Sequence, residues 1–154
     1  MIKPFTLQPL VNLAQKNNSE ATRRFGQLNQ QQQAAQEKLQ SLQQYRKDYQ
    51  QRFQESARSG MGPTEMRNFQ DFIKRLDTAI EAQKRVVEQS QSMLQAGRTE
   101  LQDAQRKMKS FETLAQRHAD SVKKLEAKAE QKTMDEFSGR KSTFNAGDRP
   151  KDAS

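Results

Sequence analysis

The chain has 154 residues, of which 32% are hydrophobic and 6% aromatic, and its mean hydropathy is −1.15. This composition excludes a thick globular core, because large apolar side chains are too few. The sequence has no cysteine, which excludes disulfides and thiolate metal sites. No apolar run approaches the roughly 18 residues of a membrane span. We therefore expect a cytoplasmic protein without direct membrane insertion.

The formal net charge is +8, with 27 basic and 19 acidic residues, and the isoelectric point is about 9.9. A basic chain can bind nucleic acid, but a phosphate-binding face concentrates Lys and Arg and excludes carboxylates. Here acidic residues alternate with basic ones almost everywhere, as on a solvated helix surface. We therefore predict that the protein does not bind nucleic acid. The alternative, a basic coiled-coil protein that binds nucleic acid, stays open.

A first helix is predicted from about residue 10 to 57, after a lead-in with two prolines. Apolar side chains recur at alternating steps of three and four residues, which is the seam of a coiled coil. Glutamine fills many positions between them and suits an exposed helix face. The seam positions are Val11, Ala14, Asn18, Ala21, Phe25, Leu28, Gln32, Ala35, Leu39, Leu42, Arg46, Tyr49 and Phe53.

A second, longer helix is predicted from about residue 64 to 137. Its seam keeps the same spacing without an internal proline. The positions are Met66, Phe69, Ile73, Leu76, Ile80, Gln83, Val87, Ser90, Leu94, Gly97, Leu101, Ala104, Met108, Phe111, Ala115, His118, Val122, Leu125, Ala129 and Lys132. Between the helices, residues 58–63 contain Gly60, Gly62 and Pro63, which suit a helix end, a turn and a new helix start.

These features predict an all-α fold in which two long helices form an antiparallel coiled-coil hairpin, because a short loop makes them neighbours. The hairpin is expected to occupy residues 1–137 as one domain. Gly139 is expected to follow the helix end, and residues 138–154 are expected to form a disordered tail. Gly26 and Gly97, inside the helices, are expected to mark close backbone approach or local flexibility.

The predicted helices differ in length, so the first can cover the second only to about residue 112, apart from what residues 1–9 add. Beyond that point Ala115, Val122, Leu125 and Ala129 are expected to face nothing in their own chain. An uncovered apolar seam needs a partner or frays. A homodimer formed through this segment is one alternative.

A second apolar line lies beside the seam, where Phe72, Ala79, Val86 and Met93 recur every seven residues. We expect Val86 and Met93 to be buried in a broadened core. The hairpin should bring Tyr45 close to Phe72 and Leu76 near the loop. For Tyr45 and Phe72, two interpretations stay open: they widen the buried core, or they form an exposed docking patch.

Candidate catalytic residues are absent from the sequence pattern. His118 is the one histidine and lies on the seam, where a buried or interface imidazole is favoured over a metal ligand. The Gly60 to Pro63 segment lacks the lysine and hydroxyl residue of a phosphate loop. We expect a protein that is not an enzyme and has no cofactor or metal.

Four short stretches extend this interpretation. They are QSLQQYRKDYQQRF (40–53), NFQDFIKRLDTAIEAQ (68–83), SFETLAQR (110–117) and QKTMDEF (131–137). Together with the hairpin layout, they resemble the FliJ family, a small coiled-coil component of the bacterial flagellar protein-export apparatus. The resemblance implies a stalk-like protein, similar to the central stalk of rotary ATPases, whose helix ends insert into the hexameric export ATPase. It also implies binding to the cytosolic linker of the membrane export gate and to export chaperones, at the inner face of the cell membrane.

The resemblance further implies two sets of site residues. The gate set carries the gate-binding surface of the family: Leu42, Tyr45, Tyr49, Phe72, Leu76 and Ala79. Gln83 and Lys38 stand where the family pattern has histidine and glutamine. The ring set lies at the end remote from the loop and is expected to contact the ATPase ring: Leu10, Leu13, Arg23, Arg24, His118, Val122 and Leu125. A purely structural coiled-coil adaptor is the remaining alternative.

Overall fold

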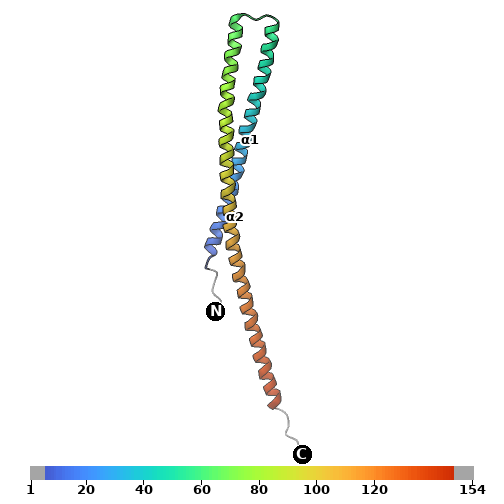
Figure 1. Cartoon of the computed structure of the whole chain (residues 1–154). Helices are drawn as coiled ribbons and strands as arrows, with labels where there is room; N and C mark the ends of the chain where they lie inside the picture. The colour runs from blue at the N-terminus through green and yellow to red at the C-terminus, as the bar shows by residue number, and fades with distance from the viewer. Residues whose placement is uncertain (1–5, 148–154) are drawn as a thin grey trace, which may run out of the picture. The chain divides into compact units, whose positions relative to one another are not determined.

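A computed structural model describes the backbone of residues 6–147 and the side chains of residues 6–143. Two helices, α1 (Gln8–Arg58) and α2 (Pro63–Gly147), are joined by a short loop and run antiparallel (Figure 1). The described part of the chain contains no strand. The prediction of an all-α antiparallel hairpin is confirmed.

The chain divides into two compact units. One consists of Gln15–Arg106 and holds the loop with the adjoining parts of both helices. The other combines Met1–Ala14 with Lys107–Ser154. We call them the loop unit and the terminal unit and describe each by itself.

The predicted seam accounts for the buried side chains. On α1, every seam position from Val11 to Phe53 is buried or half-buried. On α2, the same holds from Phe69 to Val122, whereas Met66 at the loop is 38% exposed. A spacing of 3.5 residues therefore places one continuous line of each helix toward its partner.

A buried apolar cluster in the loop unit lies beside a buried polar residue. Ala35, Leu39, Ile80 and Val87 form a buried cluster, against which Leu42 packs. Gln83 lies on the seam between Ile80 and Val87 and is only 7% exposed. Its Nε2 donates a hydrogen bond of 2.9 Å to the backbone carbonyl of Ala35 across the interface. A buried amide is tolerated here because it has this partner.

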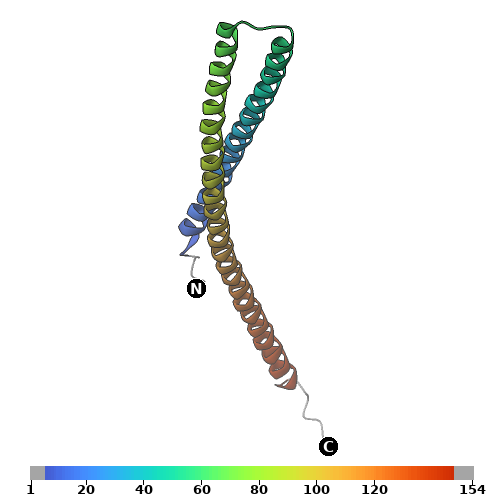
Figure 2. The same cartoon turned by 45° about the horizontal axis from the view of Figure 1, so that its top comes forward.

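The spacing between α1 and α2 changes along the loop unit. In Figures 1 and 2 the helices diverge toward the loop, and large rings from Tyr49, Phe53, Phe69 and Phe72 fill that region. Farther from the loop Gly97 is buried, and a Cβ added there would lie 2.6 Å from Leu28 Cδ1. Large aromatic rings therefore stand where α1 and α2 are far apart, and a glycine stands where the two helices are close.

The connection between the helices follows from local backbone chemistry. Gly60 has a φ of 95°, which glycine adopts without the steric cost that a Cβ imposes. The amide of Ser59 donates to the carbonyl of Glu55 at 3.2 Å and closes the last turn of α1. Pro63 begins α2, where its fixed φ is favourable, and the Met66 amide donates to the Gly62 carbonyl at 3.0 Å.

The second helix is longer than predicted. It continues past Phe137 and Gly139 to Gly147, so the first part of the expected tail is helical. A single glycine in a helix costs only about 1 kcal/mol relative to alanine and need not end it. The last part of the expected tail, residues 148–154, lies outside the described residues.

In the terminal unit, the exposed stretch of α2 starts later than predicted. Ala115 and Val122 are half-buried, although they were expected to face nothing in their own chain, and His118 between them is half-buried as well. The described chain there begins with a turn at Thr6 and Leu7, and Leu7 is half-buried, so cover extends beyond the predicted helix start. From residue 123 to 143 every side chain is exposed, as expected for Leu125 and Ala129.

The two helix-internal glycines predict opposite responses to alanine. A Cβ at the exposed Gly26 meets nothing within 4 Å, so Gly26→Ala is expected to stabilise the protein by roughly 0.5–1 kcal/mol through helix propensity. Gly97→Ala must displace the Leu28 side chain, which offsets that gain. Thermal unfolding followed by circular dichroism compares them. Equal increases in Tm would show that close approach does not constrain position 97.

Candidate functional site

The loop end of the hairpin carries a connected cluster of aromatic rings. The ring centroids of Tyr49 and Phe72 lie 4.4 Å apart, and those of Tyr49 and Phe69 lie 5.0 Å apart. Tyr45 meets Phe72 edge to face at 6.1 Å, while Phe53 lies 5.5 Å from Phe69. Such arrangements add stability beyond area burial. The cluster joins α1 to α2 and holds Tyr45 at its edge.

The gate set is brought together in the loop unit, with graded exposure. Tyr45 is 49% exposed, and Ala79 is also exposed. Leu42, Tyr49 and Phe72 are half-buried, which agrees with their seam or near-seam positions. Leu76 is 7% exposed and belongs to the interface between the helices. In the closed hairpin, Tyr45 and Ala79 are thus the members most open to a partner.

Two residues expected in the core are on the surface instead. Val86 is 46% exposed and Met93 is 48% exposed, so the prediction of their burial is wrong. The positions that flank an antiparallel seam are covered only where the partner helix presents a large side chain. The line beside the seam is therefore apolar and open beyond Ala79. Its seven-residue spacing was visible in the sequence, but its exposure was not.

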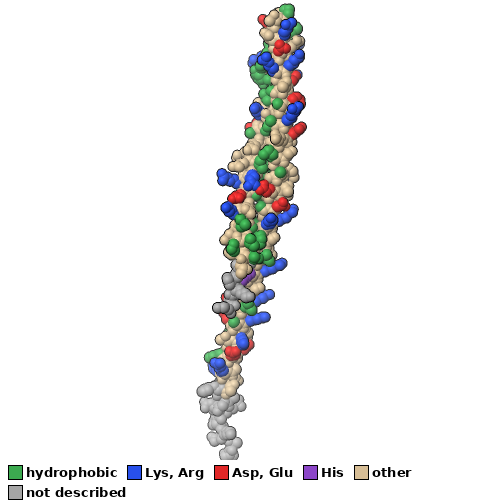
Figure 3. Space-filling view, turned by 90° about the vertical axis from the view of Figure 1, so that its left-hand side faces the viewer, with side chains coloured by type: hydrophobic (Ala, Val, Ile, Leu, Met, Phe, Trp, Pro, Cys, Tyr) green, Lys and Arg blue, Asp and Glu red, His purple; other side chains and the backbone are tan. Residues whose placement is uncertain are grey.

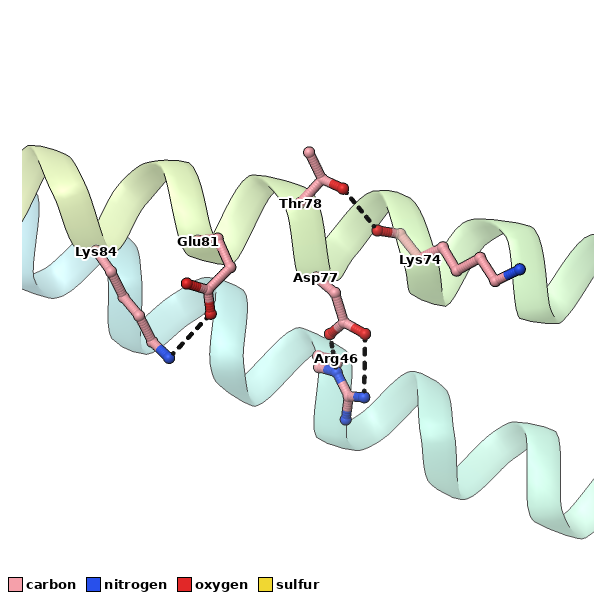
Figure 4. A network of polar contacts seen from close by, with 6 residues as sticks. All are labelled: Arg46, Lys74, Asp77, Thr78, Glu81 and Lys84. Carbon is pink, nitrogen blue, oxygen red and sulfur yellow. Dashed lines mark hydrogen bonds and ion pairs between the residues drawn. The ribbon is translucent and has the colours of Figure 1, made fainter.

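On the side of the seam opposite to Tyr45, Val86 and Met93, an ion pair joins the two helices (Figure 4). Arg46 Nη2 donates to Asp77 Oδ2 at 3.4 Å, and Arg46 Nε donates to the other carboxylate oxygen. This hydrogen bonding lowers the pKa of Asp77 below its ordinary value. Nearby on α2, Lys84 Nζ lies 3.2 Å from Glu81 Oε1. Arg46 thus occupies a seam position that is usually apolar, and it joins the helices there through polar contacts with Asp77.

The ring set divides between the two units. In the terminal unit, Leu10 is 41% exposed, Leu13 is 51% exposed and Leu125 is 57% exposed, whereas His118 and Val122 are half-buried. In the loop unit, Arg23 and Arg24 are exposed. Arg24 is paired with Glu100, and the hydrogen bond between them raises the pKa of Arg24.

Charge and donor chemistry give little support to other kinds of site. Figure 3 shows Lys and Arg interspersed with Asp and Glu along the visible face. Within the described residues, no three His, Asp or Glu side chains gather as a metal site would require. No helix in that same part is both long and apolar enough to cross a membrane.

Comparisons with known proteins agree with the hairpin and with the sequence patterns. The family described as "Flagellar FliJ protein" matches residues 3–145. The Flagellar FliJ protein of Salmonella typhi is 27% identical over 134 residues, covering 87% of this chain and 91% of that protein. The protein of the same description from Escherichia coli K12 is 26% identical over 134 residues, with the same coverage.

A solved structure supports the fold independently. A Chlamydia trachomatis protein described as a YscO homologue superposes with a TM-score of 0.63, covering 96% of this chain and 99% of its own. Its sequence identity is only 16%, so it supports the helical arrangement alone. The family match over residues 3–145, with the two flagellar relatives, shows that this chain belongs to the FliJ family of flagellar proteins.

Proposed function

We propose that this protein is a non-enzymatic component of the flagellar protein-export apparatus that links the export ATPase to the membrane export gate. In this role it acts as a stalk in the ATPase ring, and it escorts export chaperones. It works in the cytoplasm, peripherally at the inner face of the membrane. Family membership supports the export role. The observation that carries the linking role is the presence of exposed apolar side chains in each of the two units.

The loop unit offers the surface for the gate linker. Tyr45 is held against Phe72 while half of its surface remains open, so the ring is ordered before binding. A preordered aromatic side chain loses little conformational entropy on binding and is a common hot spot. Ala79, on α2, lets a partner approach the helix backbone closely.

The terminal unit offers the surface for the ATPase ring. After Val122, α2 presents Leu125, Met134 and Phe137, which are 57%, 66% and 67% exposed. A single helix exposing such side chains gains stability by burying them against a partner. A stalk inside a ring of six subunits contacts them unequally and so biases their conformations.

The gate contact is tested by truncating Tyr45. Tyr45→Ala should weaken binding of the purified gate linker by roughly tenfold or more, because a partly exposed aromatic anchor is lost. Tm should change little, since half of that side chain is already in solvent. Isothermal titration calorimetry measures the affinity, and Gln43→Ala on the other flank is the matched control.

Leu76→Ala separates packing from recognition. Leu76 is buried, so this change should lower Tm as well as any gate affinity. An unchanged affinity in Tyr45→Ala would contradict the assignment of this surface to the gate.

A further inference from the structure

The part of α1 that belongs to the terminal unit is a short segment with few buried side chains. It comprises residues 8–14, which we call the strap. Val11 and Ala14 are its buried side chains, and every other residue of the strap is exposed. A helical segment this short is marginal in water without packing against a partner. Two small apolar anchors therefore hold the strap against the rest of its unit.

The heptad spacing identifies what the strap covers on α2. In the loop unit, Leu39 and Ile80 belong to the same buried cluster. Val11 lies four heptads before Leu39, and Met108 lies four heptads after Ile80, so the antiparallel register places Val11 opposite Met108. Both residues belong to the terminal unit, and Met108 is half-buried. Release of the strap would therefore uncover the α2 seam around Met108.

The strap is followed by a stretch of α1 that favours the helix poorly. Asn17, Asn18 and Ser19 are consecutive, and their short polar side chains compete with the helix for backbone hydrogen bonds. Asn18 occupies a seam position, where its Oδ1 is buried without a hydrogen-bond partner in the described part of the chain. Thr22 Oγ1 donates a hydrogen bond of 2.8 Å to the Asn18 carbonyl, a contact that slightly weakens and bends helices. Both the helix and the seam are thus weakened next to the strap.

On the loop side of this weak stretch, directed polar contacts join the helices. Arg24 pairs with Glu100, and Arg46 pairs with Asp77. Proteins open locally in cooperative units that end where stronger contacts begin. An opening that starts at the N-terminal end of α1 should therefore stop before Arg24.

We propose that the strap is a releasable cover, which detaches from α2 as one unit, breaks from the rest of α1 at residues 17–19 and uncovers the seam around Met108. Leu10 and Leu13, which are 41% and 51% exposed, provide a means of release, because a partner that binds them can draw the strap away. Release would lengthen the α2 surface proposed for the ATPase ring. Only that last step rests on the proposed function.

Hydrogen exchange measures the detachment in the intact chain. The amides of residues 12–18 donate to carbonyls of the strap, so they lose their partners when it detaches. They should share one level of protection, roughly tenfold or more below that of residues 35–46. Asn18→Leu supplies a helix former and an apolar seam residue and should raise their protection roughly tenfold. Gln32→Leu, at a half-buried seam position of the loop unit, is the matched control and should leave it unchanged.

A thiol reports on the uncovering of α2. Because the chain has no cysteine, Met108→Cys introduces a single reactive group. Its reaction with a maleimide should slow roughly tenfold when Asn18→Leu is added, since the opening that exposes it becomes rarer. Adding Gln32→Leu should leave the reaction rate unchanged.

A tether tests whether release matters for the ATPase. Val11→Cys with Met108→Cys is joined by a short bismaleimide, and the same variant capped with N-ethylmaleimide is the untethered control. The tether lies at buried and half-buried positions and leaves Leu10 and Leu13 exposed. We expect the tethered chain to lose most of the stimulation of ATP hydrolysis that the capped chain retains.

Three results would overturn the proposal. One is protection that rises steadily from residue 12 and does not respond to Asn18→Leu, which is ordinary fraying of a helix end. Another is an equal reaction rate of the Met108→Cys thiol with and without Asn18→Leu. The third is full ATPase stimulation by the tethered chain. Absence of stimulation by the capped chain would instead contradict the proposed ring contact, and hydrogen exchange would then decide whether the strap detaches.

Discussion

Ile80→Asp is expected to unfold the paired helices of the loop unit. Ile80 is 6% exposed and contacts the buried cluster of Ala35, Leu39 and Val87. The change removes a large apolar side chain, at about 2–5 kcal/mol, and places a carboxylate where it has no partner. Domains of this size have a total stability of roughly 5–15 kcal/mol. Far-UV circular dichroism and urea unfolding measure the loss.

Val86→Asp is the matched control, since it introduces the same carboxylate on the same helix. Val86 is 46% exposed, so its charged replacement stays hydrated and Tm should change little. If Ile80→Asp and Val86→Asp unfolded at the same urea concentration, the division into a buried seam and an open flank would be wrong.

We expect the intact chain to raise hydrolysis by the export ATPase, and ending the chain after Val122 to return hydrolysis to the rate of the ATPase alone. The truncation removes the part of α2 whose side chains are all exposed, and it keeps the covered seam. Helix pairing and gate-linker binding should therefore survive. A phosphate-release assay with the purified ATPase, with and without the truncated chain, measures the effect.

A less invasive variant addresses the same surface. Val122→Asp with Leu125→Asp keeps the chain length but replaces two ring-set side chains by charges. We expect it to lose ATPase stimulation, whereas Tyr45→Ala should keep it. Full stimulation by the truncated chain would contradict placement of this end in the ring.

Much of the fold could be predicted because one periodic signal determines it. The three-and-four spacing identified the buried line of both helices, including the polar seam residues Asn18, Gln32 and Gln83. The Gly60 and Pro63 positions identified the loop, since each has a specific backbone role there. The end of α2 was less predictable, because the propensity cost at Gly139 is small compared with the cooperativity of a long helix.

The candidate site was only partly predictable. The heptad spacing and the loop position predicted that Tyr45, Phe72 and Leu76 lie close together. The contact between the rings of Tyr45 and Phe72 confirms this for those two residues. It could not decide exposure at Val86 and Met93, because exposure beside a seam depends on the distance between the helices and on the facing side chain. Nor could it identify the bond from Gln83 to the Ala35 carbonyl, which requires the register of one helix against the other.

That bond fixes how α1 and α2 can move against each other in the loop unit. The Ala35 carbonyl is reachable because alanine has only a methyl group, whereas one heptad away in either direction stand Leu28 and Leu42. Sliding α1 by a heptad would place a leucine beside the Gln83 amide and leave a buried polar group without its partner, which costs about 1–3 kcal/mol. It would also move Leu28 away from Gly97. Mechanical force applied to this unit would therefore bend or turn the two helices as one body, and would not be relayed by slippage of one helix along the other.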